Sequence, residues 1–221
     1  MEAACQMLEW AHWHGHGGTC YLVRLETRKL PRRMKRHNSM FVTFVRTGER
    51  RYAVRAAVVG KAVVEMSPAP GYDPMVPHDL QHFIVERALG IEGGVFGQLA
   101  AGGTAGTFNA VEIREKSRRT RERRKRAAKQ AKLALSRDDP LRSERATYVC
   151  WHNWLSQSSD PALRAKARAM EKTVCSIVNG MRADERALYS TSKLTQVRAE
   201  FERLSARWSK LEVGESFTEP W

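Results

Sequence analysis

The hydrophobic pattern of this chain changes its period after residue 66, and this change limits the possible folds more than any other feature. Residues 40–46 (MFVTFVR) and 51–59 (RYAVRAAVV) follow a period of two, and residues 62–66 (AVVEM) form a third short run. A period of two is typical of β-strands, and the turn residues between the runs favour an antiparallel meander. We expect the third strand to end before Pro68, because proline cannot donate to a sheet ladder.

Helical patterns follow the strands. Residues 78–89 (HDLQHFIVERAL) are expected to form a helix. Pro77 suits the first position of that helix, and Gly90 suits its end. Two further helices are expected, one over residues 142–156 and one that starts at Pro161.

The last helix has the strongest amphipathic pattern of the chain. Its apolar residues step by three and four, which places them on one face: Leu194, Val197, Phe201, Leu204, Trp208 and Leu211. Residues 212–218 are expected to return as an edge strand beside the meander. We therefore predict an α+β fold, in which a small antiparallel meander of about three to four strands packs against a helical layer, with a long basic helix in addition.

Composition divides the chain into four segments. Residues 1–39 are basic and rich in histidine and are expected to form a flexible arm, and residues 40–110 are expected to hold the meander, the 78–89 helix and a glycine-rich turn. Residues 111–141 are expected to be the basic helix, and residues 142–221 a helical bundle with a C-terminal edge strand. Two interpretations of the arm stay open: it is a genuine extension, or it precedes a natural start at Met40.

Charge and cysteine content exclude several classes of protein. The formal net charge of +14 favours anionic partners such as nucleic acid or an acidic protein. No apolar run reaches the ~18 residues that a membrane helix needs, so we expect no membrane span. The four cysteines include no CxxC pair and do not indicate a disulfide framework. We expect a cytoplasmic protein, and the sequence does not decide whether it is an enzyme.

Two histidines give the first functional signal. His78 and His82 are four residues apart on the expected helix, so both imidazoles can reach one divalent metal, with zinc as the first candidate. Glu86 lies on the same face and is expected to support His82, either as a ligand or as a hydrogen-bond acceptor behind it. Zinc usually needs further ligands, and the candidates elsewhere in the chain are Glu92, Gln98, Cys150 and His152.

Asp79 follows the first histidine, at the position where HExxH enzymes carry a catalytic glutamate. If the chain is an enzyme, a metal-activated water is the simplest mechanism, with Asp79 as the candidate base. Its side chain is one methylene shorter than glutamate, so we do not predict a protease. A structural alternative stays open, in which Asp79 complements the helix dipole and both histidines serve only the fold.

Part of this segment resembles known proteins. The pattern His78-Asp79-x-x-His82, with Gly97-Gln98 further on, is similar to the HDxxH zinc motif of the Coq-type scaffold or decarboxylase proteins of ubiquinone biosynthesis. The resemblance implies zinc ligation by the two histidines. The spacing departs from that family's pattern, so its glutamate is here either shifted, with Glu92 nearer to His82, or replaced by the amide of Gln98 further along. Residues 76–103 also resemble a bacterial family with the phrase VPHDLxHFxVExxLG…GxFGQLAAGG, which implies a bacterial protein and no particular activity.

An arginine-rich run gives the second functional signal. Residues 114–126 (REKSRRTRERRKR) contain nine basic and two acidic residues and no apolar one. Clustered guanidinium groups bind phosphates, so residues 114–132 are an alternative site for nucleic acid or an acidic partner, with the histidines structural. The residues that would carry it are Arg118, Arg119, Arg121, Arg123, Arg124, Lys125, Arg126 and Lys129.

Overall fold

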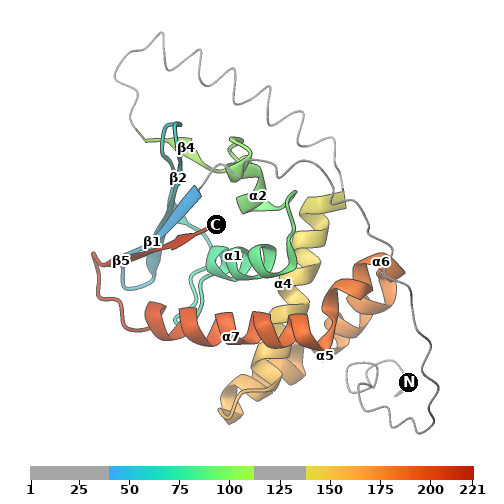
Figure 1. The fold of residues 1–221 in the computed structure, drawn as a ribbon. Coiled ribbons are helices and arrows are strands. Elements are labelled where there is room, and N and C mark those ends of the chain that lie inside the picture. The colour runs from blue at the N-terminus through green and yellow to red at the C-terminus, as the bar shows by residue number, and fades with distance from the viewer. Residues whose placement is uncertain (1–39, 112–137) are drawn as a thin grey trace, which may run out of the picture. The chain divides into compact units, whose positions relative to one another are not determined.

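Met40 begins a five-stranded antiparallel sheet in the computed structural model, which describes residues 40–111 and 138–221 (Figure 1). The strand order is β4-β3-β2-β1-β5. The strands are β1 (Met40–Gly48), β2 (Arg51–Val58), β3 (Val64–Ala69), β4 (Asn109–Ala110) and β5 (Ser216–Pro220). The α+β class and the meander are confirmed. The sheet exceeds the predicted three to four strands because the two-residue β4 adds one more.

The third strand does not end where the sequence predicted. β3 continues through Pro68 to Ala69. Its register shifts on the way, since Val54 pairs with Met66 while Tyr52 pairs with Ala69. This irregularity gives β3 one residue more than β2 over the same stretch, and a bulge leaves residues out of the ladder. Proline has no backbone N–H, and a residue left out of the ladder does not need one. The expected end of the third strand before Pro68 was therefore wrong.

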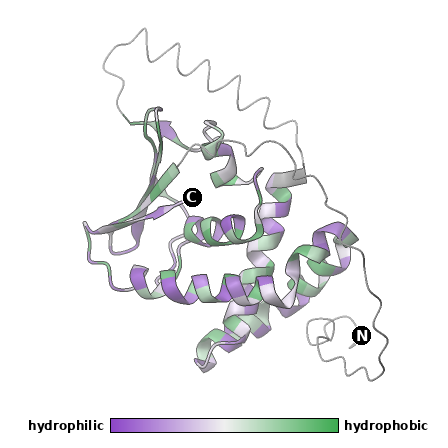
Figure 2. Ribbon diagram, in the orientation of Figure 1, coloured by the Kyte–Doolittle hydropathy of each residue, from purple (hydrophilic) through white to green (hydrophobic). Residues whose placement is uncertain are grey.

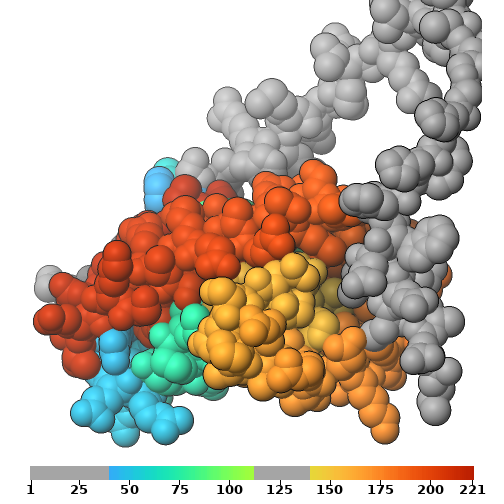
Figure 3. All heavy atoms as spheres, turned by 90° about the horizontal axis from the view of Figure 1, so that it is seen from below, coloured from blue at the N-terminus to red at the C-terminus, as the bar shows by residue number. Residues whose placement is uncertain are grey.

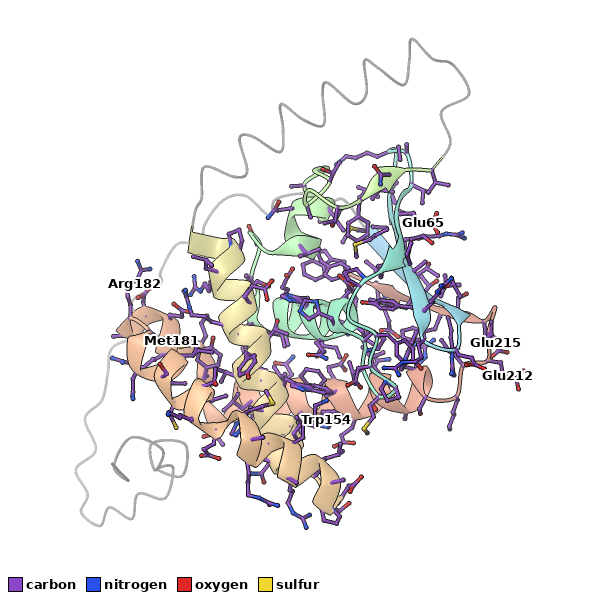
Figure 4. The ribbon with its side chains drawn as sticks, turned by 180° about the vertical axis from the view of Figure 1, so that it is seen from behind. Glu65, Trp154, Met181, Arg182, Glu212 and Glu215 are labelled. Atoms are coloured by element: carbon purple, nitrogen blue, oxygen red, sulfur yellow. The ribbon has the colours of Figure 1, made fainter. Side chains whose placement is uncertain are left out.

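β5 is the predicted edge strand, shifted by a few residues from the expected 212–218. It pairs with β1 in antiparallel register, with Phe44 opposite Phe217. The turn that precedes it holds Glu212 and Glu215, both labelled in Figure 4, and the Glu212 amide donates to the Glu215 carboxylate. This turn uses the residues that the sequence pattern assigned to the start of the strand.

Seven helical elements are present in the described ranges. They are α1 (His78–Leu89), α2 (Val95–Ala100), α4 (Asp138–Ser156), α5 (Pro161–Gly180), α6 (Ala183–Arg186), the 3-10 turn η2 (Ala187–Tyr189) and α7 (Thr191–Trp208). The predicted helices at 78–89, 142–156 and 161 onward are confirmed. α4 begins earlier than expected because Pro140 lies in its first turn, where no backbone donor is needed. Residues 112–137, most of the predicted basic helix, lie outside the described residues.

α1 occupies the centre of the fold, between the sheet and the helices α4 and α7 (Figure 1). On the sheet side, Phe83 packs edge-on against Phe44 and also against Phe96 of α2. α4 packs against both α5 and α7, which lie on the face shown in Figure 3. Polar and apolar residues alternate along α7 (Figure 2), and its buried residues include Phe201 and Trp208.

One hydrophobic core joins the strands, α1, α2, α4, α5 and α7. Trp154, labelled in Figure 4, stacks on Phe201 across the contact of α4 with α7. Among the helices of the described residues, none has both the length and the apolar character that a bilayer crossing requires.

A buried carboxylate fastens the last strand to the helices. Glu219 of β5 is 5% exposed and faces three arginines. Arg203 donates to both of its oxygens at 3.0 and 2.7 Å, Arg207 donates to Oε1, and Arg87 stands 3.4 Å from Oε2. Burial alone would raise the pKa of Glu219, but the arginines, Arg203 first, lower it below the ordinary value. The charged form of this carboxylate therefore stabilises the fold.

Replacing Glu219 tests this arrangement through its pH dependence. A group whose folded pKa is lowered stabilises the fold above its ordinary pKa, and that contribution is lost as the pH falls through the folded value. We expect Glu219→Gln to lower the free energy of unfolding by about 1–2 kcal/mol at neutral pH, since the arginines are partly exposed. The difference from the wild type should therefore shrink as the pH falls below the ordinary pKa of glutamate.

Urea denaturation at several pH values measures this effect. Glu212→Gln is the matched control, because Glu212 is exposed in the turn before the same strand. A Glu219→Gln deficit that stays constant from neutral to acid pH would contradict the proposed role of its charge.

Candidate metal centre

Three potential metal ligands meet between α1 and α4. His78 and His82 come from α1, and Glu144 comes from α4; each offers one ligand atom, and these atoms all lie within 4.8 Å of one another. The two imidazole rings are 4.6 Å apart and nearly edge-to-face. His82 is buried, whereas His78 and Glu144 are exposed. The spacing of the histidines thus brings them together as predicted, with a carboxylate from a distant helix beside them.

The separations are close to those of a bound metal. Two atoms that ligate one tetrahedral zinc lie about 3.3 Å apart, given bonds of about 2.0–2.1 Å. The Nε2 atom of His82 is 3.5 Å from Oε2 of Glu144. The three atoms span up to 4.8 Å, so the exposed side chains of His78 and Glu144 would have to move closer to bind one ion. His82 Nε2 itself is buried and has no hydrogen-bond partner.

The other ring nitrogen of His82 faces a set of buried polar groups. Nδ1 lies 2.9 Å from the Ser143 hydroxyl and 3.3 Å from the Thr147 hydroxyl. Ser143 in turn donates to Oε1 of Glu86 at 2.6 Å, and that oxygen is 3.6 Å from Nδ1. Glu86 therefore stands behind His82 and not in the cluster of three, as expected for a group that supports a ligand.

Glu86 also holds the start of α2. Its carboxylate is fully buried and accepts the backbone amides of Val95 at 2.8 Å and Phe96 at 2.9 Å. These are amides of a first helical turn, which have no partner within the helix. The carboxylate lies so close to the residue before them, Gly94, that a Cβ there would stand 2.2 Å from Glu86 Oε1. This close approach explains one glycine of the glycine-rich segment.

Gly94→Ala tests the position of the Glu86 carboxylate. The added methyl group and the buried carboxylate cannot occupy the same space, so we expect a loss of about 1–3 kcal/mol in the free energy of unfolding. Gly180→Ala is the control, because a Cβ at Gly180 meets nothing within 4 Å. Chemical denaturation of both variants measures the difference. Equal stability of the two would show that the carboxylate does not lie against Gly94.

The electrostatics distinguish the three candidate ligands. Burial alone would lower the pKa of His82, but the Glu144 and Glu86 carboxylates outweigh it and raise the pKa to about 9. Desolvation, followed by the charge of His82, lowers the pKa of His78, which is therefore a neutral imidazole at neutral pH. The pKa of Glu144 is lowered, chiefly by His82. A metal ion would displace the proton of His82. The lowered pKa values of His78 and Glu144 favour the neutral imidazole and the carboxylate, which are the forms that bind metals.

Asp79 faces the sheet and is engaged there. The Tyr52 hydroxyl lies 2.5 Å from Oδ2 of Asp79 and 2.5 Å from the Pro70 carbonyl. Burial raises the pKa of Asp79. The Tyr52 hydroxyl has one proton to donate, which the Asp79 carboxylate and the Pro70 carbonyl share as acceptors. This arrangement favours a structural role for Asp79, and its role as a catalytic base stays a prediction.

The other predicted ligands have different surroundings. The Gln98 amide donates to the Gly93 carbonyl at 2.8 Å, within the segment that leads into α2. Cys150 is buried in the core, and burial raises the pKa of its thiol to about 12, which disfavours the thiolate that binds metals. His152 is buried beside Glu171, at 3.6 Å. Glu92 is exposed. Among the described residues, the ligand group contains Glu144 and none of these four.

Sequence reasoning missed Glu144 and Ser143. A weak signal for Ser143 does exist: with Ala146, Thr147 and Cys150 it follows helical spacing along the buried face of α4. Two hydroxyl residues one turn apart on such a face need a buried polar partner. The arginine-rich run, from Arg118 to Lys129, lies outside the described residues.

Comparison of the chain with protein-family profiles, with curated proteins and with solved structures finds no match.

Proposed function

We propose that this chain binds a divalent metal through His78, His82 and Glu144. One observation carries the proposal: the buried Nε2 atom of His82 has no hydrogen-bond partner, although it faces a carboxylate and a second imidazole. The contact of Nε2 with Glu144 is an ion pair at 3.5 Å and not a hydrogen bond, and native structures rarely leave a buried polar atom without a hydrogen bond. A metal ion bound to Nε2 would supply the missing interaction.

The ligand types narrow the identity of the metal. Two imidazoles and one carboxylate are a common set for zinc, and the same set with open positions is used by non-haem iron(II). Three protein ligands leave at least one coordination position for water or another small ligand, an arrangement typical of catalytic zinc sites. The exposure of His78 and Glu144 supports access from solvent. If the site is catalytic, the metal would supply an activated water.

Metal content by elemental mass spectrometry tests the proposal on the full chain. We expect about one zinc, iron or manganese ion per chain at this site. The ion should be lost in His82→Ala, and the metal affinity should fall by about tenfold or more in Glu144→Gln. The arm histidines His12, His14 and His16 can bind stray metal, so their triple alanine variant is the control and should retain the ion.

The same variants define the contrary outcome. Metal that disappears with the arm histidines but persists in His82→Ala would overturn the assignment. A wild-type chain that takes up no zinc, iron(II) or manganese on titration would overturn it as well. Circular dichroism of each variant confirms that the fold is retained before the metal contents are compared.

The basic run supports a second candidate function, binding of nucleic acid or an acidic partner through residues 114–132. The observation that favours it is the density of charge, because residues 111–145 contain 14 basic and 6 acidic residues. Contacts between arginine or lysine and phosphates release counterions, so affinity that arises in this way falls steeply with salt.

Fluorescence anisotropy with a labelled RNA and a labelled DNA duplex tests this candidate. If six or more of the basic side chains contact phosphates, we expect affinity to fall about 10³-fold or more between about 50 and 200 mM salt. Replacing the basic residues with glutamine should remove the binding: Arg118, Arg119, Arg121, Arg123, Arg124, Lys125, Arg126 and Lys129. His82→Ala is the control and should bind as the wild type does. Affinity that survives the replacement would rule out this segment as the binding site.

A further inference from the structure

We infer that Ser143, held by the Glu86 carboxylate, is a positioning residue that directs the Nε2 atom of His82 to the metal. This inference rests on the proposed function. A histidine ligates a metal through one ring nitrogen, and the hydrogen bond of the other nitrogen decides which one is available. The argument therefore depends on which group donates in the contact between His82 and Ser143.

The direction of the hydrogen bonds follows from the number of protons available. Ser143 carries one hydroxyl proton, and its oxygen lies 2.6 Å from Glu86 Oε1 and 2.9 Å from His82 Nδ1. The Glu86 carboxylate accepts the backbone amides of Val95 and Phe96, and Ser143 donates its proton to the same carboxylate. The lone pairs of the Ser143 oxygen then accept a proton from Nδ1.

With its proton on Nδ1, a neutral His82 presents a bare Nε2. This is the atom that lies 3.5 Å from Glu144 and has no hydrogen-bond partner. The opposite tautomer would place a bare Nδ1 against Ser143, and one proton would have to serve both the 2.6 Å and the 2.9 Å contact. Thr147 lies further from Nδ1, at 3.3 Å, and makes the weaker contact.

The matched pair Ser143→Ala and Thr147→Val tests the inference on the full chain. Zinc affinity is measured by competition with a chelator of known strength. Loss of a group that orients a metal ligand typically weakens binding by about 10–100-fold, so we expect this loss in Ser143→Ala. Thr147→Val should change the affinity by less than about threefold. An unchanged affinity in Ser143→Ala would contradict the inference.

Nitrogen-15 NMR of the His82 ring distinguishes a positioning role from a purely structural one, because it reports which ring nitrogen carries the proton. In the zinc-loaded wild type we expect coordination through Nε2 and a hydrogen-bonded proton on Nδ1 that exchanges slowly. Ser143→Ala should make that proton exchange rapidly. The amides of Val95 and Phe96, which Glu86 binds, serve as the folding control and should stay protected from exchange. Coordination through Nδ1 in the wild type would overturn the inference.

The metal-free protein separates this inference from the proposed function. At alkaline pH, where the metal-free ring is neutral, its nitrogen-15 shifts report directly which ring nitrogen holds the proton. A wild-type chain that binds no zinc but holds its proton on Nδ1, and loses this preference in Ser143→Ala, would refute the metal site and retain the positioning role. A wild-type ring with its proton on Nε2 would refute the positioning role whether or not zinc binds.

Discussion

The carboxylate of Glu86 accepts hydrogen bonds from two distant parts of the chain, the hydroxyl of Ser143 on α4 and two amides at the start of α2. A buried carboxylate without donors destabilises a fold by several kcal/mol, because its hydration is lost and nothing replaces it. α1 can therefore pack in the core only when α2 and α4 stand where they supply those donors. The position of Ser143 also sets the position of its neighbour Glu144, so the same constraint brings the third candidate ligand to the histidines.

The central place of α1 explains why so many of its polar side chains have specific partners. A helix that is covered by a sheet on one side and by helices on another cannot leave its polar groups to water. Asp79 is hydrogen-bonded to Tyr52 on the sheet side, and Nδ1 of His82 and the Glu86 carboxylate contact Ser143 on the α4 side. Arg87, in the last turn, bonds Glu200 of α7. His78, at the exposed start of the helix, is left available at the surface.

Most helices and strands could be predicted from local sequence patterns, because each depends on residues that are neighbours in the sequence. The helix at 78–89 needed only Pro77, Gly90 and an apolar period, and the histidine pair required nothing beyond that helix. Glu144 could not be found in this way, because its approach to His82 depends on how α4 packs against α1. Choosing a third ligand by residue type gave Glu92, Gln98, Cys150 and His152. The packing buries Cys150 in the core and places His152 beside Glu171. The extension of β3 past Pro68 has the same origin, since a bulge depends on the partner strand.

The charges around His82 indicate how the proposed site can exist with and without a metal. Glu86 and Glu144 flank one imidazole, and in the metal-free protein a proton on His82 balances them, as its raised pKa reflects. A divalent ion at Nε2 would supply positive charge in place of this proton and would need the exposed His78 and Glu144 to move closer. The helices that carry the ligands, α1 and α4, pack into one hydrophobic core with the sheet. Zinc fingers differ, because they fold only when the metal is bound. Here the fold would form first and present a site ready for an exchangeable ion with an open coordination position.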